Sequence, residues 1–474
     1  MITFIVSLIL LIAGYFIYGK ISEKIFRIDP DRAVPAIKKS DGLDYVELPT
    51  WKAFLIQFLN IAGTGPIFGA IAGAMWGPNA FLWIVFGCIF AGAVHDFMIG
   101  MMSLRSDGAS VSVLVGDNLG TGMRRLMAIF SCILLLLVGV VFVSSPADLL
   151  ADLTNQNRWI FVAIIMVYYI VATVLPIDKI IGKIYPIFGI ALFVMAAGIL
   201  GGMIANGMFM DIPEFSFSNP HVNDQSIFPY LFISIACGAI SGFHATQSPM
   251  MARCIKNERD GRRVFYGAMI SEGIIALIWA AAAMTFFGSL QGLSETGPAA
   301  VVVNTVSQGL MGNVGMVLAV LGVVACPITS GDTAFRALRL TIADAFKIDQ
   351  TKSRNRYIIV IPIFIIAVSL LFIDFNIIWR YFSWANQTLA CIALWTAAAF
   401  LKKQGSNFFI AVIPAMFMTV VVTCYILVAP EGFGAIATSV FGSIKIAELA
   451  GVAIGIAAAA LAYIAFNKKT SSQK

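Results

Sequence analysis

The chain has 474 residues, of which 59% are hydrophobic and only 12% are charged, and its formal net charge is +6. Soluble proteins carry about 25% charged residues, so this composition, with its long apolar runs, is that of a membrane protein rather than a soluble enzyme. The basic residues lie in short loops between the apolar runs and not on one exposed face, which argues against a nucleic-acid-binding protein.

Apolar segments long enough to cross a bilayer, about 20 residues each, follow one another along the whole chain. The first has neither a basic leader nor a small-residue cleavage site, so we expect a retained helix rather than a signal peptide. The ninth is expected to continue as a helix to about residue 346. In chain order the 13 expected spans are 2–19, 51–75, 79–103, 126–145, 159–175, 184–206, 228–250, 264–288, 312–330, 357–373, 376–400, 407–428 and 446–466.

The charge of the connecting loops orients these spans. Residues 251–263 (MARCIKNERDGRR) are strongly basic, whereas residues 207–227 contain acids and no Lys or Arg. Because Lys and Arg accumulate in cytoplasmic loops, we place the N-terminus outside and the C-terminus in the cytoplasm of a multi-pass inner-membrane protein.

Two of the expected spans are interrupted by helix-breaking residues. The second reads FLNIAGTGPIFGAIAG around Gly65, and the seventh reads ISIACGAISGFHATQSPM around Gly242. Glycine weakens a helix and proline removes a donor, so backbone groups are freed there at membrane depth. Lipid does not satisfy such groups, and they are tolerated where they line an enclosed cavity. Either span alone is also compatible with a kink or a small-residue helix contact.

The spacing of the two interruptions favours the cavity. Five spans separate the start of one unit from the start of the next, and an odd number makes the second unit enter the membrane from the opposite side. Interrupted helices at matching positions of inverted halves point to the binding site of a secondary transporter. We therefore predict an all-α integral membrane protein of about 13 helices, with a LeuT-like five-plus-five inverted repeat and extra helices.

This prediction divides the chain into four parts. Residues 1–50 form an N-terminal helix and a cytoplasmic loop, and residues 51–227 form the first repeat. Residues 228–404 form the second repeat, and residues 405–474 add two helices and a short cytoplasmic tail.

The interrupted backbone is the expected substrate site. Amides freed near Thr64, Gly65 and residues 241–243 can hold an anionic group, and carbonyls near Ala62 and Cys237 can coordinate a cation. The substrate-binding candidates are Gly63, Thr64, Gly65, Ser241, Gly242, Phe243 and His244.

Several stretches together resemble one family. They are AVPAIKKSDGLDYVE at 33–47, IAGTGPIFG at 61–69, GAVHDFM at 92–98, ACGAISGFHATQSP at 236–249, TSGDTAFRALR at 329–339 and WRYFSWANQTLA at 379–390. The combination resembles the carbon starvation protein A family of peptide transporters, within the amino acid–polyamine–organocation superfamily. The resemblance implies a five-plus-five inverted-repeat fold and cation-driven uptake of peptides, or of small carboxylates such as pyruvate, during nutrient starvation. Longer members carry a His-His pair before the IAG motif, where this chain has Ile56 and Gln57.

Charge inside a span is costly and usually faces a cavity or a partner, and four ionisable residues within spans are candidates for function. His95 and Asp96 are candidates for a proton relay or cation site, with a buried structural pair as the alternative. His244, in the second interruption, is a candidate for substrate contact or gating, or else a packing residue. Glu272 is expected to be protonated or paired, and it is a further candidate for ion coupling.

A polar group on the ninth span is the other candidate for coupling. In transporters of this architecture, hydroxyls of the corresponding helix join carbonyls of the first broken helix around sodium, which prefers oxygen ligands. This suggests a sodium site at Ala62, Thr329 and Ser330. Alternatively the hydroxyls bond their own helix and Asp332 pairs with Arg336. The group consists of Thr329, Ser330, Asp332 and Thr333; Asn386 and Gln387 on the eleventh span are expected to join helices.

No P-loop and no hydrolase motif is present in the sequence, so we expect neither ATP-driven transport nor an enzyme. The expected protein is a cation-coupled symporter that needs no cofactor beyond H⁺ or Na⁺ and whose partners are a small solute and the lipid bilayer. An amino acid transporter is the alternative, followed by a passive channel or an intramembrane enzyme. The sequence leaves open the substrate, the choice between proton and sodium, and the oligomeric state.

Overall fold

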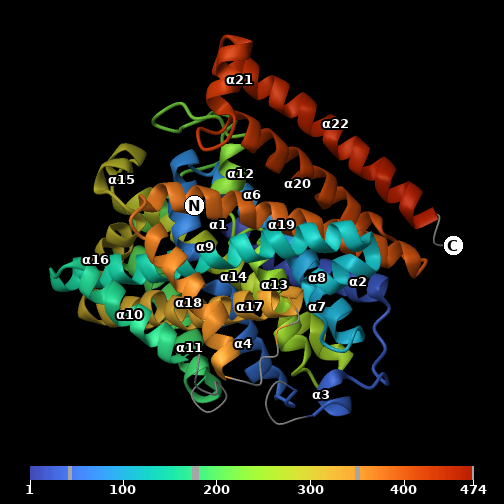
Figure 1. The fold of residues 1–474 in the computed structure, drawn as a ribbon. Helices are drawn as coiled ribbons and strands as arrows, with labels where there is room; N and C mark the ends of the chain where they lie inside the picture. The colour runs from blue at the N-terminus through green and yellow to red at the C-terminus, as the bar shows by residue number, and fades with distance from the viewer. Residues whose placement is uncertain (41–44, 173–180, 347, 349–352, 472–474) are drawn as a thin grey trace.

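The computed structural model describes the chain except for residues 41–44, 173–180, 347, 349–352 and 472–474. In the described residues the regular structure is helical, and the helices pack side by side around a buried centre (Figure 1).

The first half of the chain begins with a long bent helix and continues into the first interrupted one. Its elements are α1 (Ile2–Phe16), α2 (Tyr18–Phe26), α3 (Pro35–Lys38), α4 (Thr50–Ala62), α5 (Gly65–Gly73), η1 (Ala74–Trp76), α6 (Asn79–Phe86), η2 (Gly87–Gly92), α7 (Ala93–Arg105), α8 (Val111–Leu119), α9 (Thr121–Thr154), α10 (Arg158–Ala172), α11 (Ile181–Ala205) and η4 (Met208–Asp211).

The second half begins with the second interrupted helix and ends with three helices along one edge of the molecule. Its elements are α12 (Tyr230–Ser234), α13 (Gly242–Ala252), η5 (Glu258–Asp260), η6 (Arg262–Tyr266), α14 (Gly267–Phe286), α15 (Leu290–Thr296), α16 (Ala299–Ala319), η7 (Val320–Ala325), α17 (Cys326–Phe346), α18 (Ser353–Leu370), α19 (Phe375–Lys403), α20 (Phe409–Val428), α21 (Gly434–Phe441) and α22 (Ile444–Ser471).

Within the described residues, each of the 13 predicted spans overlaps helix. Among the described residues, nine helices are long and apolar enough to cross a membrane, and the bent pair α4–α5 makes ten. The three remaining predicted spans correspond to the shorter helix α10, to α18, and to the interrupted pair α12–α13. The predicted all-α membrane fold is therefore confirmed.

One boundary prediction was wrong. The ninth span was expected to begin at residue 312, but helix already starts at Ala299 and runs into α17. The helix is kinked at Gly312, whose φ of 58° and ψ of −142° lie outside the helical region. Glycine is a helix-breaking signal, so the glycines at 309 and 312 led the prediction to place a loop there. The residues before them are rich in Ala and Val and form helix.

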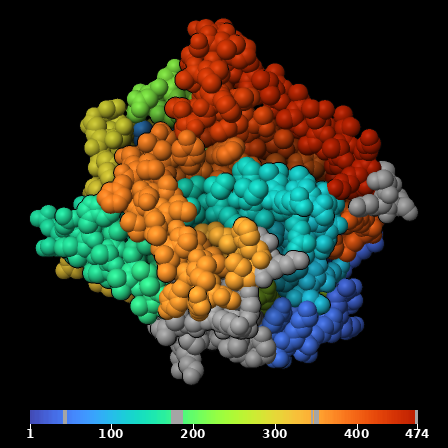
Figure 2. Space-filling model, in the orientation of Figure 1, coloured from blue at the N-terminus to red at the C-terminus, as the bar shows by residue number. Residues whose placement is uncertain are grey.

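The depth of burial separates central from peripheral helices. In the spans Asn79–Arg105, Glu258–Phe286 and Phe375–Lys403, 83% of the most apolar window is buried, against 28% in Ile2–Phe26 and 22% in Ile444–Thr470. Helices α20–α22 accordingly form an outer edge of the molecule (Figures 1 and 2). The interrupted helices and the polar residues predicted to be functional belong to the buried centre.

Candidate functional site

The first interruption lies between α4 and α5, whose axes meet at 49°. Gly63 ends α4 with a φ of 15° and a ψ of −144°, and Pro66 occupies the first turn of α5, where its missing N–H costs no hydrogen bond. A Cβ atom on Gly63 would lie 2.4 Å from the ring of Phe142 in α9. The glycine and proline signals in the sequence thus mark a real break, and glycine is required there by close packing.

The second interruption is longer. Helix α12 ends at Ser234, and α13 begins only at Gly242, so residues 235–241 cross the core as non-helical chain. Asn386 of α19 binds this segment: its Oδ1 accepts the backbone N–H of Phe243 at 2.7 Å, and its Nδ2 donates to the Ser241 hydroxyl at 3.0 Å. Gln387 donates to the carbonyl of Phe232 at 2.9 Å.

These contacts decide two predictions. Asn386 and Gln387 do join helices, as the sequence indicated, and they do so by satisfying the interrupted backbone. The amide of Phe243, which was expected to be free for an anion, is not free, because the Asn386 carboxamide already accepts its hydrogen.

The two interruptions touch each other. A Cβ atom on Gly65 would lie 2.3 Å from the Sγ of Cys237, and one on Gly69 would lie 3.1 Å from the carbonyl oxygen of Ser234. Thr64 and Ser241 at the two breaks are fully buried. The structure therefore brings the two breaks together in the core, where a shared pocket between inverted halves was expected.

Four ionisable side chains meet beside the second break. Nδ1 of His95 is 2.8 Å from Oδ1 of Asp96, and Nδ1 of His244 is 2.8 Å from Oδ2 of the same carboxylate. Nε2 of His244 is 3.3 Å from Oε2 of Glu272, an ion-pair distance, although the alignment of the two groups is not that of a hydrogen bond. All four side chains are fully buried. We refer to His95, Asp96, His244 and Glu272 as the buried His–Asp–Glu cluster.

The sequence singled out each member of this cluster but not their association. The members come from three helices, α7, α13 and α14, whose contacts depend on tertiary packing. The His95–Asp96 pair is buried, as the structural alternative has it, and His244 is a second histidine partner of the same carboxylate.

Of the polar residues on α17, one contacts the first interrupted helix and the others bond within their own helix or pair with a nearby arginine. Ser330 donates to the carbonyl of Leu59 in α4 at 3.1 Å, so α17 does reach the first interrupted helix, one turn before Ala62. The hydroxyls of Thr329 and Thr333 bond carbonyls of their own helix, at 2.7 Å and 2.8 Å.

The carboxylate of Asp332 lies 3.9 Å from the Arg336 guanidinium, the pairing that the sequence suggested. These contacts favour the structural interpretation for Thr329, Asp332 and Thr333. The sodium site at Ala62, Thr329 and Ser330 remains a prediction.

Polar contacts hold the segments at both ends of the span α6 to α7. At the end of the basic loops, Arg105 binds the buried carboxylate of Glu258 through two hydrogen bonds of 2.9 Å and 2.8 Å. At the other end, Trp76 donates to the carbonyl of Gln225 at 3.0 Å, and His221 packs on the Trp76 ring with centroids 4.6 Å apart. Trp76 and Arg105 stand before and at the end of the same helical span, α6 to α7, so these contacts lie at its opposite ends.

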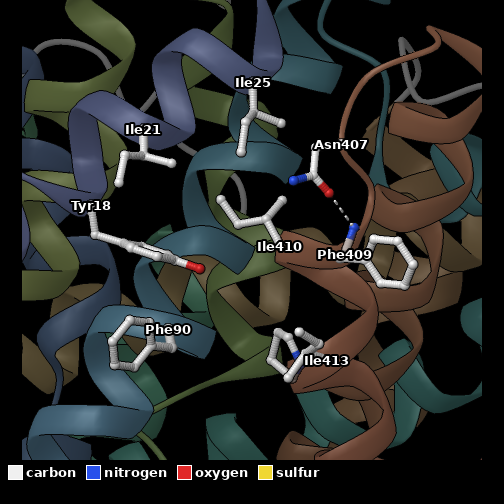
Figure 3. Close-up of a pocket in the computed structure, with 9 residues that line it drawn as sticks. Tyr18, Ile21, Ile25, Phe90, Asn407, Phe409, Ile410 and Ile413 are labelled. Atoms are coloured by element: carbon white, nitrogen blue, oxygen red, sulfur yellow. Dashed lines mark hydrogen bonds between the residues drawn. The ribbon is translucent and has the colours of Figure 1, made fainter.

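An open groove of about 400 Å³ lies away from this site, between α2, η2 and α20 (Figure 3). Its walls are mostly apolar, and the Asn407 carboxamide in it accepts the Phe409 N–H at 3.1 Å. The residues lining it are Tyr18, Ile21, Ile25, Phe90, Asn407, Phe409, Ile410, Ile413 and Pro414, and none of the predicted site residues is among them.

Comparison with known proteins identifies relatives of this chain. The family model for carbon starvation protein CstA matches residues 1–162, 142–308 and 282–425. An uncharacterized membrane protein of Haemophilus influenzae is 44% identical over 347 residues, which are 62% of this chain and 94% of that protein. The peptide transporter CstA of Campylobacter jejuni is 30% identical over 56% of this chain and 47% of its own length. The pyruvate/proton symporter BtsT of Escherichia coli is 28% identical over 59% and 48%. The chain spans about half the length of these two transporters.

Solved structures with the same arrangement are transporters of the LeuT fold. MhsT in complex with L-phenylalanine superposes with a TM-score of 0.56 and 14% identity, over 87% of this chain and 98% of its own. A manganese transporter of Eremococcus coleocola superposes with a TM-score of 0.56 and 13% identity, over 90% and 99%. At this identity the likeness shows the fold alone, and it confirms the predicted LeuT-like architecture.

Proposed function

Because the chain belongs to the carbon starvation protein CstA family, we propose that it is a secondary transporter that takes up a small carboxylate such as pyruvate, or a short peptide, together with a cation. It is a multi-pass protein of the bacterial inner membrane and not an enzyme. The observation that carries the proposal is the contact between two interrupted helices, one from each half of the chain, at Gly65 and Cys237 inside the core.

The interruptions offer a suitable environment for an anionic group. Helices α5 and α13 both begin at the breaks, and the N-terminus of a helix attracts negative charge through its free amides and its dipole. Pyruvate and peptides share a carboxylate, so one site of this kind serves either substrate. Thr64, at the start of α5, has a buried hydroxyl with no hydrogen-bond partner within the described part of the chain. We assign this hydroxyl to the substrate.

We propose that transport proceeds by opening the site at one end at a time. We assign the Arg105–Glu258 contact at one end of the span α6 to α7 and the loop over Trp76 at the other end to the two gates of the site. Breaking one set while the other holds exposes the site to one side at a time, which is alternating access. The small residues at the breaks allow the packed halves to move past one another.

The test is substrate counterflow in proteoliposomes that contain the purified protein, with radiolabelled pyruvate and a series of dipeptides. Counterflow needs no ion gradient, so it reports the substrate site by itself. We expect saturable exchange of at least one of these carboxylates, and its absence for all of them would contradict the proposal.

The matched variants are Thr64→Val and Thr285→Val. Losing one hydrogen bond to the substrate at Thr64 should weaken its apparent affinity roughly three- to tenfold, with little change in thermal stability. The hydroxyl of Thr285 bonds the carbonyl of Ala281 in its own helix, so Thr285→Val should leave affinity unchanged. Equal affinities in the two variants would remove Thr64 from the site.

A further inference from the structure

We infer that the buried His–Asp–Glu cluster is a proton-binding site, which makes H⁺ the ion that drives this transporter. The inference rests on the proposed transport function and adds to it the coupling ion and the residues that carry it. His244 follows Gly242 by two residues in the first turn of α13, so this member of the cluster borders the proposed substrate site.

The contacts of Asp96 determine which nitrogen of each histidine carries a hydrogen. Each of its oxygens lies 2.8 Å from the Nδ1 atom of one histidine, His95 or His244. An ionised carboxylate has no hydrogen to donate, so each Nδ1 carries the hydrogen of its bond. Both oxygens of Asp96 are then covered by N–H groups. A sodium ion, which prefers oxygen ligands, would meet these hydrogens instead of free lone pairs.

The contact between His244 and Glu272 requires a third proton. A neutral His244 that is protonated on Nδ1 presents a bare lone pair at Nε2, and Oε2 of Glu272 lies 3.3 Å away. An ionised carboxylate would be repelled by that lone pair at this distance. The contact is favourable only if one proton resides on either Nε2 or the carboxyl group. His244 and Glu272 therefore hold one exchangeable proton between them.

Net charge argues for a fourth proton. With one proton shared by His244 and Glu272, the cluster still bears the single negative charge of Asp96, fully removed from water. An unbalanced buried charge is costly, so the cluster favours binding one more proton. Nε2 of His95 is a position for it, since this buried nitrogen has no hydrogen-bond partner in the described chain.

The neighbouring titratable groups do not supply the missing positive charge. The thiols of Cys88 and Cys237 lie within electrostatic range of both Asp96 and Glu272, and the thiol of Cys326 lies within range of Glu272. The Cys88 thiol donates to the carbonyl of Met269, and the Cys237 thiol is hydrogen-bonded with Ser241. A thiol is neutral or negative and never positive, so none of these groups offsets the charge of Asp96, and protonation of the cluster itself balances it.

This arrangement couples proton to substrate. A substrate carboxylate bound at the adjacent breaks adds a second negative charge, which strengthens the demand for a proton in the cluster. The proton enters from the outer side with the substrate, and both leave toward the cytoplasm, so that the moving species is neutral overall. By reciprocity, the bound proton strengthens substrate binding by the same factor.

The experiment uses the full chain in proteoliposomes, with pH and sodium gradients imposed separately and uptake of radiolabelled pyruvate and dipeptides as the readout. We expect accumulation under an inward proton gradient and none above equilibration under a sodium gradient. With one proton per substrate anion, a pH difference of about one unit limits accumulation to about tenfold. Accumulation driven by sodium alone would overturn the inference.

The decisive variant is Glu272→Gln, which keeps the shape of the side chain but holds no exchangeable proton. We expect it to lose proton-driven accumulation while counterflow is retained, and Glu295→Gln, at an exposed acid in α15, to behave like the native protein. Retained proton-driven accumulation in Glu272→Gln would overturn the assignment of the coupling proton to His244 and Glu272. Loss of counterflow in the native protein would contradict the proposed function instead, so the two failures are distinguishable.

A second measurement does not depend on the variant folding. A pH-sensitive dye inside the vesicles should report acidification of the lumen when substrate is added outside to the native protein. Substrate entry without this pH change would also overturn the inference.

Discussion

At the scale of single residues, one carboxylate binds the N-terminus to the loop before α12. Glu214 accepts hydrogen bonds from the backbone N–H of Ile2 and Thr3 and from the Thr3 hydroxyl, and its Oε1 lies 2.9 Å from the N-terminal ammonium. The Thr3 hydroxyl and the terminal ammonium lower the pKa of Glu214 from 4.5 to about 2. The ionised form of this side chain therefore holds α1 to the loop before α12.

The lowered pKa predicts a pH dependence of stability. A carboxylate with a depressed pKa in the folded state stabilises the fold above its ordinary pKa, and this contribution is lost as the pH falls through the folded value. Between about pH 5 and pH 2 the thermal midpoint of the native protein should therefore fall more than that of Glu214→Gln. Thermal unfolding of the detergent-solubilised proteins measures it. A constant difference between the two proteins over this range would show that the carboxylate contributes nothing.

The cluster residues illustrate the limit of residue-level prediction from sequence. An intramembrane His, Asp or Glu is recognisable on its own because charge is so costly at membrane depth. Whether it is paired depends on which helices become neighbours. His244 is adjacent in space to Asp96 although 148 residues separate them in the chain.

At the scale of elements, the two interruptions fit together through glycine. The close approach of α5 to residues 235–241 leaves no room for a side chain at position 65, where a Cβ atom would lie 2.3 Å from Sγ and 2.4 Å from Cβ of Cys237. The sequence showed why the helices break. It did not show that this glycine is also the point at which the breaks meet.

Gly65→Ala should therefore destabilise the closed protein by about 1–3 kcal/mol, the usual cost of overpacking, and slow transport. Because the clash involves both the Cβ and the Sγ of residue 237, Cys237→Gly should restore part of the loss in the double variant. Thermal unfolding and counterflow of the single and double variants measure both effects.

Gly201→Ala is the control for this pair, since a Cβ atom at position 201 of α11 would meet nothing within 4 Å. It should be neutral or slightly stabilising. Additive losses in the double variant, with no rescue by Cys237→Gly, would show that positions 65 and 237 are not in contact.

At the scale of the whole molecule, the distribution of basic residues predicts orientation. The loop at 207–227 should face outward and the loop at 251–263 should face the cytoplasm. Ser216 and Lys256 are exposed representatives of these loops. Ser216→Cys should react with a membrane-impermeant maleimide in intact cells, and Lys256→Cys only after the membrane is opened.

The native protein, with its own cysteines, provides the background for this labelling. The reverse pattern of reaction would invert the topology. It would leave the fold unchanged but would reverse the side from which the proton enters the cluster.

The sequence by itself determined the membrane class, the positions of the helices, their two breaks and the identity of the costly polar residues. Each of these is a local property: hydropathy over a span, glycine and proline at a break, or a charge among apolar neighbours. Only the tertiary structure decided which of these features meet. It placed Gly65 against Cys237, occupied the amide of Phe243 with Asn386, and gathered side chains from three helices into one cluster. The physical reason is that contacts between distant segments depend on how helix faces pack in three dimensions, and periodicity along one helix does not specify its neighbour.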